Sequence, residues 1–510
     1  MPRLSLLTRS TAIALCLPGS AAFADLTSAD VWSDWKDYMT TAGYDVSASE
    51  ITNGGTLTVT NLNMAMDLGE EERDGTARIV MESLRFVEEG DGSVSIELPA
   101  QTMIDVTLVP ESGEQADLTI RFDQTDPVMT ATGEPGDLTY NYSADAAKLE
   151  MSNLTVNGLA ITEDIAKFDM TMTNMAYVVQ TAVGTMRSIQ QDMSIAGLSY
   201  DIAFTDPEGE GSFKLVGAMQ GIDMDGTGEL PLDSDPQDMN AMLNAGLDLT
   251  GEFTSTGGNY ELTFSGPDGS GTANSTSEGG AISFAIDTAG LLYDVVQRNV
   301  DFNMLITEFP LPLSISAAEM GTRILMPVQK SPDAQEFGLG VSLNDFTMSD
   351  MIWGLFDPTG QLPRDPATLV VDLSGQAKVL FNFLDPAQAA ILEQTGAAPG
   401  ELNALTLNSL ELDAAGARLT GKGDFSFDNS DMVTFDGMPR PEGGIDLKLV
   451  GGNGLLDKLV GMGLVPEDQA MGARMMMGLF AVPGESPDTL NSRIEVNEQG
   501  HVLANGQRIR

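Results

Sequence analysis

Histidine and cysteine are almost absent from this sequence, which has one of each, His501 and Cys16. A Ser-His-Asp triad would have to use His501, which lies at a predicted hairpin turn, and no nucleophile-elbow motif accompanies it. Cys16 lies in a leader segment, so the remaining chain has no thiol for a nucleophile, a metal site or a disulfide. Zinc sites draw most of their ligands from these two residue types. We therefore expect no catalytic residues, no metal and no cofactor, and a protein that is not an enzyme.

Basic and aromatic residues are also scarce. The chain has 25 Lys and Arg against 75 Asp and Glu, a formal net charge of −50. Such a surface repels phosphates, which excludes nucleic acid as a partner. Aromatic residues make up 6% with only 3 Trp, which disfavours a sugar hydrolase built on paired carboxylates. No apolar run after the leader is long enough for a transmembrane segment.

Residues 1–24 have the form of a secretory signal peptide. Arg3 and Arg9 precede a short apolar stretch, and Ala22-Phe23-Ala24 supplies a small-x-small cleavage site. We expect cleavage after Ala24 and residence in the periplasm.

The chain does contain a repeated six-residue motif, clearest at Val59–Met64. Its apolar residues occur at every second position, are separated once by three positions (the step of three), and then occur at every second position again. A strand points successive side chains to opposite faces, so one extra residue, a β-bulge at the small polar position, would keep both halves on one face. The alternative is two short strands around a turn. The other copies are 81–86, 151–156, 172–177, 195–200, 219–224, 343–348 and 407–412.

This pattern predicts a mainly β protein with a few helices, built on long curved antiparallel sheets of bulged strands. We expect an N-terminal β-rich repeat region over 25–300 that opens with a helix at 27–43, with Ser28 as its N-cap. A C-terminal β-rich region over 301–510 would contain two late helices and a terminal hairpin. Shorter patterns predict helices at 176–193 and 235–247, a loop or linker at 265–280, and the late helices at 455–462 and 466–480.

Methionine is abundant, at 29 residues, and many lie on the apolar side of the repeat. Methionine suits both irregular cores and adaptable ligand contacts. Either these side chains pack a closed core, or they line a groove that takes an acyl chain. The residues predicted for such a groove are Met64, Met66, Met151, Met172 and Met219.

Asp223-Met224-Asp225-Gly226 resembles the middle of a calcium-binding EF-hand loop, which needs several oxygen ligands and a sharp glycine turn. The first ligand position is occupied by Gly221, and Leu232 stands where the closing Glu belongs. An acidic β-turn is therefore the favoured interpretation.

Two functions remain open from these residues. The first is a non-enzymatic periplasmic protein that binds or shields an apolar envelope molecule, a lipid, along a curved sheet. The second is a structural or protein-interaction module with a closed core and an acidic surface.

Three late segments carry a family resemblance: 357–368, 435–444 and 504–510. They resemble a family of secreted alphaproteobacterial proteins known as domain of unknown function 2125. The resemblance implies export from a Gram-negative cell, and it brings no assigned activity and no catalytic residues. More loosely, the bent strands are similar to those of AsmA-like envelope proteins, which implies long curved sheets that carry lipid.

Overall fold

The computed structural model describes residues 26–67, 73–110, 115–207, 209, 211–234, 238–267, 269–396 and 398–510. Within these residues, 27 strands form one sheet whose neighbouring strands pair in the antiparallel sense. The predicted fold class, mainly β with a few helices, is confirmed. The predicted signal peptide, 1–24, lies outside the described residues.

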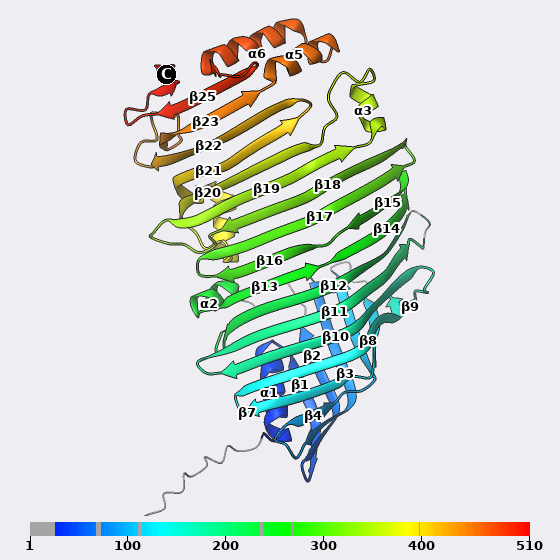
Figure 1. Cartoon of the computed structure of the whole chain (residues 1–510). Helices are drawn as coiled ribbons and strands as arrows, with labels where there is room; N and C mark the ends of the chain where they lie inside the picture. Colours follow the sequence, from blue (N-terminus) through cyan, green and yellow to red (C-terminus); the bar gives the residue numbers. More distant parts are fainter. Residues whose placement is uncertain are drawn as a thin grey trace, which may run out of the picture.

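The sheet is a ladder in which strands close in the chain are mostly neighbours in space (Figure 1). Its first part consists of β1 (Asp45–Asn53), β2 (Thr56–Asp67), β3 (Arg73–Glu88), β4 (Val94–Glu97), β5 (Gln101–Pro110), β6 (Ala116–Thr125), β7 (Val128–Glu134), β8 (Asp137–Val156), β9 (Leu159–Ala160), β10 (Ala166–Val183), β11 (Met186–Thr205), β12 (Ser212–Pro231), β13 (Asp248–Ser255) and β14 (Gly257–Gly266).

The ladder continues without a break to the C-terminal end. The boundary between the two regions predicted from the sequence, between residues 300 and 301, falls inside β17. Strand β17 pairs with β18 on both sides of that point. The second part consists of β15 (Gly269–Ser277), β16 (Gly280–Asp287), β17 (Gly290–Ile306), β18 (Phe309–Met326), β19 (Gln335–Met348), β20 (Ala367–Val379), β21 (Gly400–Ala414), β22 (Ala417–Asp428), β23 (Arg440–Val450), β24 (Val482–Pro483), β25 (Thr489–Val496), β26 (Val502–Ala504) and β27 (Gln507–Arg508).

Helices flank the sheet at its ends and along one side. The opening helix, the two late helices and the terminal hairpin of β25 and β26 are confirmed. The N-cap of the opening helix is Thr27 rather than Ser28, because Thr27 and Asp30 form a reciprocal capping box. The helices are α1 (Ser28–Thr41), α2 (Met239–Asn244), α3 (Asp350–Phe356), α4 (Pro386–Thr395), α5 (Gly452–Gly461) and α6 (Glu467–Phe480).

Two local predictions were wrong. The helix predicted over 176–193 is the hairpin of β10 and β11, in which Tyr177 pairs with Met193 and Thr181 with Ile189. Both strands also pair outward, with β8 and β12, and these pairings override the helix-forming Met, Gln and Ala of the segment. The glycine-rich stretch 265–280 is not a loop or a linker, because most of it is strand β15. Of the helix predicted over 235–247, residues 239–244 form α2, and 235–237 lie outside the described residues.

The step of three in the repeat is a true bulge in some copies. The β1–β2 register shifts opposite Asn61, and the β6–β8 register shifts at Ser152, next to Asn153. Similar shifts occur at the copies in β19 and β21. Toward that one neighbour the strand holds an extra residue, as predicted, whereas β2 and β3, and likewise β18 and β19, take the step together without one.

In the middle of the sheet the prediction of a bulge was wrong, because neighbouring strands take the step together. Thr173 faces Gly197 and Met175 faces Ile195, so neither strand has an extra residue. Asn174 and Gly221 have positive φ angles of 49° and 51°, a left-handed conformation that Asn and Gly tolerate. These aligned irregularities form a crease across β8, β10, β11 and β12 and reappear at Asn299 of β17.

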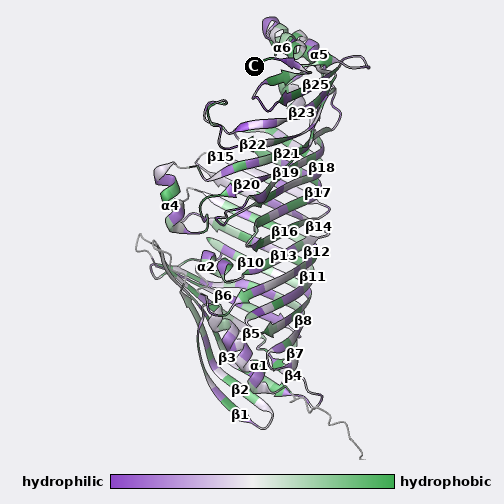
Figure 2. Ribbon diagram, turned by 90° about the vertical axis from the view of Figure 1, so that its left-hand side faces the viewer, coloured by the Kyte–Doolittle hydropathy of each residue, from purple (hydrophilic) through white to green (hydrophobic). Residues whose placement is uncertain are grey.

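Because bulges and crease both restore the alternation, the sheet has one apolar face, which we call the inner face. On β2 this face contains Leu57, Val59, Leu62 and Met64, all at most 7% exposed, as the bulge interpretation requires. Strands β1–β3, β5 and β6 fold back so that their inner face lies opposite that of β7–β13, with α1 between the two walls (Figure 2). Strand β4 joins the two walls, because it pairs with β3 and with β7. The resulting core joins Val31, Trp32, Leu57, Val59, Leu62, Leu84, Phe86, Leu138 and Tyr140.

Candidate functional site

Beyond α1 the inner face is open over the middle strands. Seven large apolar side chains there are between 37% and 47% exposed, and cross-strand pairing places them side by side. Soluble proteins rarely expose a contiguous apolar patch of this kind without a binding role. We call the set the open patch: Ile282, Phe284, Tyr293, Met320, Ile324, Met326 and Leu339.

A first hollow of about 520 Å³ lies where the open patch meets α1. One wall is α1, through Trp35, Tyr38 and Met39, and the other is the inner face of β8, β10–β13 and β16. The ring of Phe284 lies over Gly251 on the paired strand, since a Cβ at Gly251 would stand 2.3 Å from the ring. This volume falls within the range of small-molecule sites.

The first hollow contains a buried ion pair between α1 and β11. Arg187 Nη1 lies 2.9 Å from Asp34 Oδ1, with the side chains 4% and 10% exposed. The same nitrogen donates to Thr181 Oγ1, and Tyr140 donates its hydroxyl to Asp34 Oδ2 at 2.8 Å. Burial, together with the adjacent Asp34 carboxylate, raises the pKa of Tyr140, so its hydroxyl stays protonated and remains a donor.

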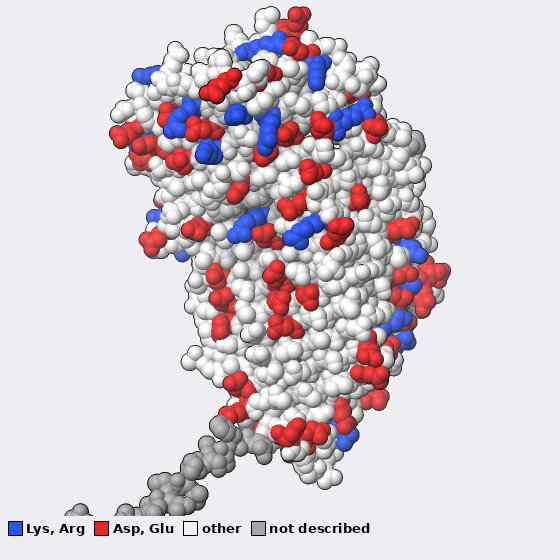
Figure 3. Space-filling model, in the orientation of Figure 1, with Lys and Arg blue, Asp and Glu red and all other residues white. Residues whose placement is uncertain are grey.

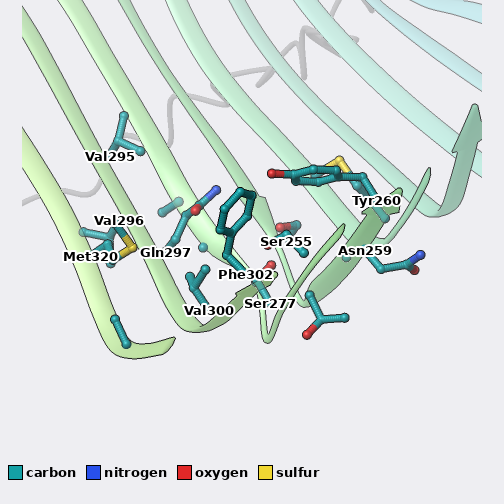
Figure 4. A pocket seen from close by; sticks show the side chains of 18 of the residues that line it. Ser255, Asn259, Tyr260, Ser277, Val295, Val296, Gln297, Val300, Phe302 and Met320 are labelled. Carbon is teal, nitrogen blue, oxygen red and sulfur yellow. The ribbon is translucent and has the colours of Figure 1, made fainter. Parts of the chain in front are cut away.

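A second hollow of about 420 Å³ lies beside the crease, and Figure 4 shows the rings of Tyr260 and Phe302 projecting into it. Both rings point to the inner face, on either side of Ser275 in the paired strands. Met219, Phe253 and Ile282 also line it. Ile282 stands two positions before Phe284, which lines the first hollow, so the two hollows are neighbours along β16.

One long edge of the inner face is covered. Leu243 and Leu247, from α2 and the residues after it, pack with Val328 in a small core of their own. Leu249 and Ile286 of the sheet contact this cluster, as does Leu384 from the loop before α4. The open patch is thus bounded by α1 at one end and by α2 along this edge.

The outer face is polar, and Figure 3 shows Asp and Glu in columns across its strands. One column runs Asp192, Asp225 and Glu252 on paired positions of β11, β12 and β13. Asp223 and Asp225 therefore lie within strand β12, so the acidic β-turn interpretation was wrong and the EF-hand geometry is absent. No group of three or more acids, His or Cys in the described residues is arranged to hold a metal ion.

The acidic column gives a prediction about pH. A hydrogen bond with Asp192, aided by desolvation and by its negative charge, raises the pKa of Asp225. A carboxyl with a raised pKa in the folded protein stabilises the fold at low pH, and this contribution is lost as pH rises through that pKa. Asp225→Asn should therefore raise the melting temperature at about pH 7 and leave it nearly unchanged at about pH 3.

Asp223→Asn is the matched control, because Asp223 faces Ser194 and Thr254 instead of acids. We expect it to change the melting temperature less than Asp225→Asn does. A lower melting temperature for Asp225→Asn at neutral pH would contradict the repulsion.

The five predicted groove methionines all lie on the inner face, but in different settings. Met219 lines the second hollow. Met64 is 7% exposed in the core beneath α1. Met66, Met151 and Met172 are half-buried and line neither hollow. Met64 and Met151 lie in one row of paired residues across the strands. In order, this row is Met64, Ile79, Ile104, Ile120 and Met151.

Sequence reasoning missed the aromatic side chains and Arg187. Tyr142, Tyr177, Phe253 and Phe284 come from separate strands, and only the pairing brings them to one surface. The one local signal for Arg187 is its position in phase with the inward-facing Ile189 of β11. His501 lies at the turn between β25 and β26, as predicted, and its backbone N–H donates to Asn497.

Comparison with known proteins places the chain in a family. No curated protein matches the sequence. Among solved structures, the unliganded ferric citrate transporter FecA is similar over 91% of this chain and 77% of its own, at 8% identity and a TM-score of 0.15, a likeness too low to carry any argument. In the described residues, no helix is long and apolar enough to cross a membrane. The family model of uncharacterised proteins conserved in bacteria, DUF2125, matches residues 241–504, and the chain belongs to this family.

Proposed function

We propose that this protein is a non-enzymatic periplasmic protein that binds an apolar envelope molecule, the acyl chain of a lipid, along the inner face of its sheet. The observation that carries the proposal is the open patch, which adjoins two hollows and exposes large apolar side chains. The sequence supports the location through its leader-like residues 1–24 and its resemblance to secreted alphaproteobacterial proteins. The looser similarity to AsmA-like proteins points to the same class of ligand.

The energetics of such binding require no catalytic or charged residue. Burying each methylene of an acyl chain is worth about 0.8 kcal/mol, so ten methylenes along the patch supply roughly 8 kcal/mol before entropy costs. The side chains of Phe284 and Tyr200 lie over Gly251 and Gly217 of the paired strands, because a Cβ at either glycine would stand 2.3 Å from the nearest atom of that side chain. These aromatic side chains add apolar surface to the inner face that an acyl chain can contact.

The second candidate is the structural or protein-interaction module. The closed core around α1 favours it, because there the two walls of the sheet are packed shut. In this case a partner protein would cover the open patch and the acidic outer face would stay in solvent. Lipid uptake by the purified protein discriminates between the two functions.

The test uses a fluorescent acyl-chain probe with an uncharged headgroup, a labelled monoglyceride, and native mass spectrometry of protein purified from its own envelope. We expect wild type to bind at about one equivalent or more. Phe284→Gln combined with Ile324→Gln should weaken binding at least about tenfold, because polar groups would interrupt the apolar surface of the open patch. Both side chains are partly exposed, so the fold should be retained.

The matched control is Val216→Gln with Leu305→Gln. These two side chains are also partly exposed, but they pair with Glu261 and Thr272 on the outer face. We expect the control to bind the probe as wild type does. Ligand-free protein from the envelope and no probe uptake by wild type would refute the lipid proposal and favour the structural module.

A further inference from the structure

The first hollow contains a cationic side chain whose hydrogen-bonding capacity is only partly used. A guanidinium group has five N–H donors. The hydrogen bonds of Arg187 to Asp34 and Thr181 both leave from Nη1. Among the described residues, Nε is buried and has no hydrogen-bond partner. Buried donors in folded proteins are nearly always paired, so this one calls for an acceptor from outside the chain.

The position of Arg187 points to a ligand headgroup. The residue lines the first hollow, together with Tyr38, whose ring lies 5.5 Å from the guanidinium carbon. Only 4% of the Arg187 side chain is exposed. From this end, Phe284 leads across to Ile282 and the second hollow. A molecule with its polar end at Arg187 could therefore lay an apolar chain over the open patch.

The charge of the hollow selects among headgroups. Asp34 and Arg187 are the charged residues that line it, and they neutralise each other. A carboxylate or phosphate headgroup would be attracted by Arg187 but repelled by Asp34, and it would lose its hydration without a net positive partner. The chain as a whole adds further repulsion through its net charge of −50. An uncharged oxygen acceptor meets no such penalty.

We propose that the lipid bound here is an uncharged acyl ester, whose ester or hydroxyl oxygen accepts hydrogen bonds from Arg187. This inference rests on the proposed function, because it assumes that the inner face takes an acyl chain. It adds the class of headgroup and the residue that recognises it. Asp34 is then a specificity residue, because it cancels the charge that would otherwise favour fatty acids.

The experiment compares palmitic acid with its monoglyceride, which share one chain and differ in headgroup charge. Binding to the full-length mature protein is measured by calorimetry at about pH 8, where the free acid is ionised. We expect wild type to bind the monoglyceride at least about tenfold more tightly than palmitate. In Asp34→Asn the Arg187 charge is no longer cancelled, so palmitate affinity should rise at least about tenfold and the preference should shrink or reverse.

Asp37→Asn removes the same charge from an exposed position on α1 and should leave the preference unchanged. A purely structural ion pair predicts a different result, in which Asp34→Asn weakens both ligands alike, and that outcome would overturn the inference. So would a wild-type preference for palmitate. Failure of wild type to bind either lipid would instead refute the proposed function itself.

Asp34→Asn could destabilise α1, so a second readout uses wild type alone. A monoglyceride with a photoreactive diazirine at the end of its chain should label strands of the open patch, such as β16 and β17. A diazirine next to its headgroup should label α1 or β11. The reverse pattern, or labelling confined to the outer face, would contradict an anchor at Arg187.

Discussion

A chain that lacks Asn61 is expected to lose roughly 3–6 kcal/mol of folding stability, the burial energy of two large apolar side chains. Asn61 is the residue with positive φ, 51°, at the bulge in β2. Removing it returns the strand to strict alternation, which turns Leu62 and Met64 to the outer face while Leu57 and Val59 stay inside. These four side chains are all at most 7% exposed in the folded protein.

Asn61→Gly is the control, because glycine adopts positive φ without strain and the Asn61 side chain is exposed. We expect this variant to unfold within about 1 kcal/mol of wild type in urea. Equal stability for the deletion and for wild type would show that β2 does not depend on the bulge to keep its apolar residues on one side.

The second large effect concerns α1. Trp32 is 2% exposed, packs against Phe86 with ring centroids 5.8 Å apart, and donates its indole N–H to Glu50 at 2.7 Å. Replacing such a side chain with alanine costs about 3–5 kcal/mol. We expect Trp32→Ala to loosen α1 from the sheet, so that its amide hydrogens exchange at least about a hundredfold faster than in wild type.

Trp32→Phe keeps an aromatic ring and removes the N–H donor together with part of the indole, so its effect should be smaller. Thr40→Ala, at an exposed position on the same helix, should have almost none. Unchanged exchange of the α1 amides in Trp32→Ala would contradict the assignment of Trp32 as the anchor. The indole hydrogen bond and that of Lys36 also lower the pKa of Glu50, so the carboxylate stays ionised at neutral pH.

The features that could be predicted are those encoded over a few neighbouring residues. The step of three at Val59–Met64 identifies which side chains share a face, since side-chain direction alternates along any strand. Helix α1 could be placed because helical spacing and a capping residue lie within one short segment. The late helix α6 and the hairpin of β25 and β26 follow from equally local signals.

Other features depend on the partner strand and so lay beyond such reasoning. Whether a step of three becomes a bulge, as at Asn61, or part of a crease, as at Asn174, depends on whether the neighbouring strand takes the same step. The segment 176–193 contains good helix formers, yet pairing on both sides makes it two strands. No pattern within a short segment indicates which strand will pair with it in the sheet.

The same distinction applies to the apolar face, which local sequence determines, and to the site on that face, which depends on strand pairing and packing. The chain's own alternation determined that one face of the sheet is apolar and that Met64, Met151, Met172 and Met219 belong to it. Only the tertiary structure decided that Met64 is sealed in a core and that Met219 lines a hollow. Asp34 and Arg187 are 153 positions apart, and they meet because α1 lies between the two walls of the sheet, close to β11. That pair is buried because the first strands of the sheet fold back and bring distant residues together. The residues that flank Asp34 and Arg187 in the chain carry no signal of this contact.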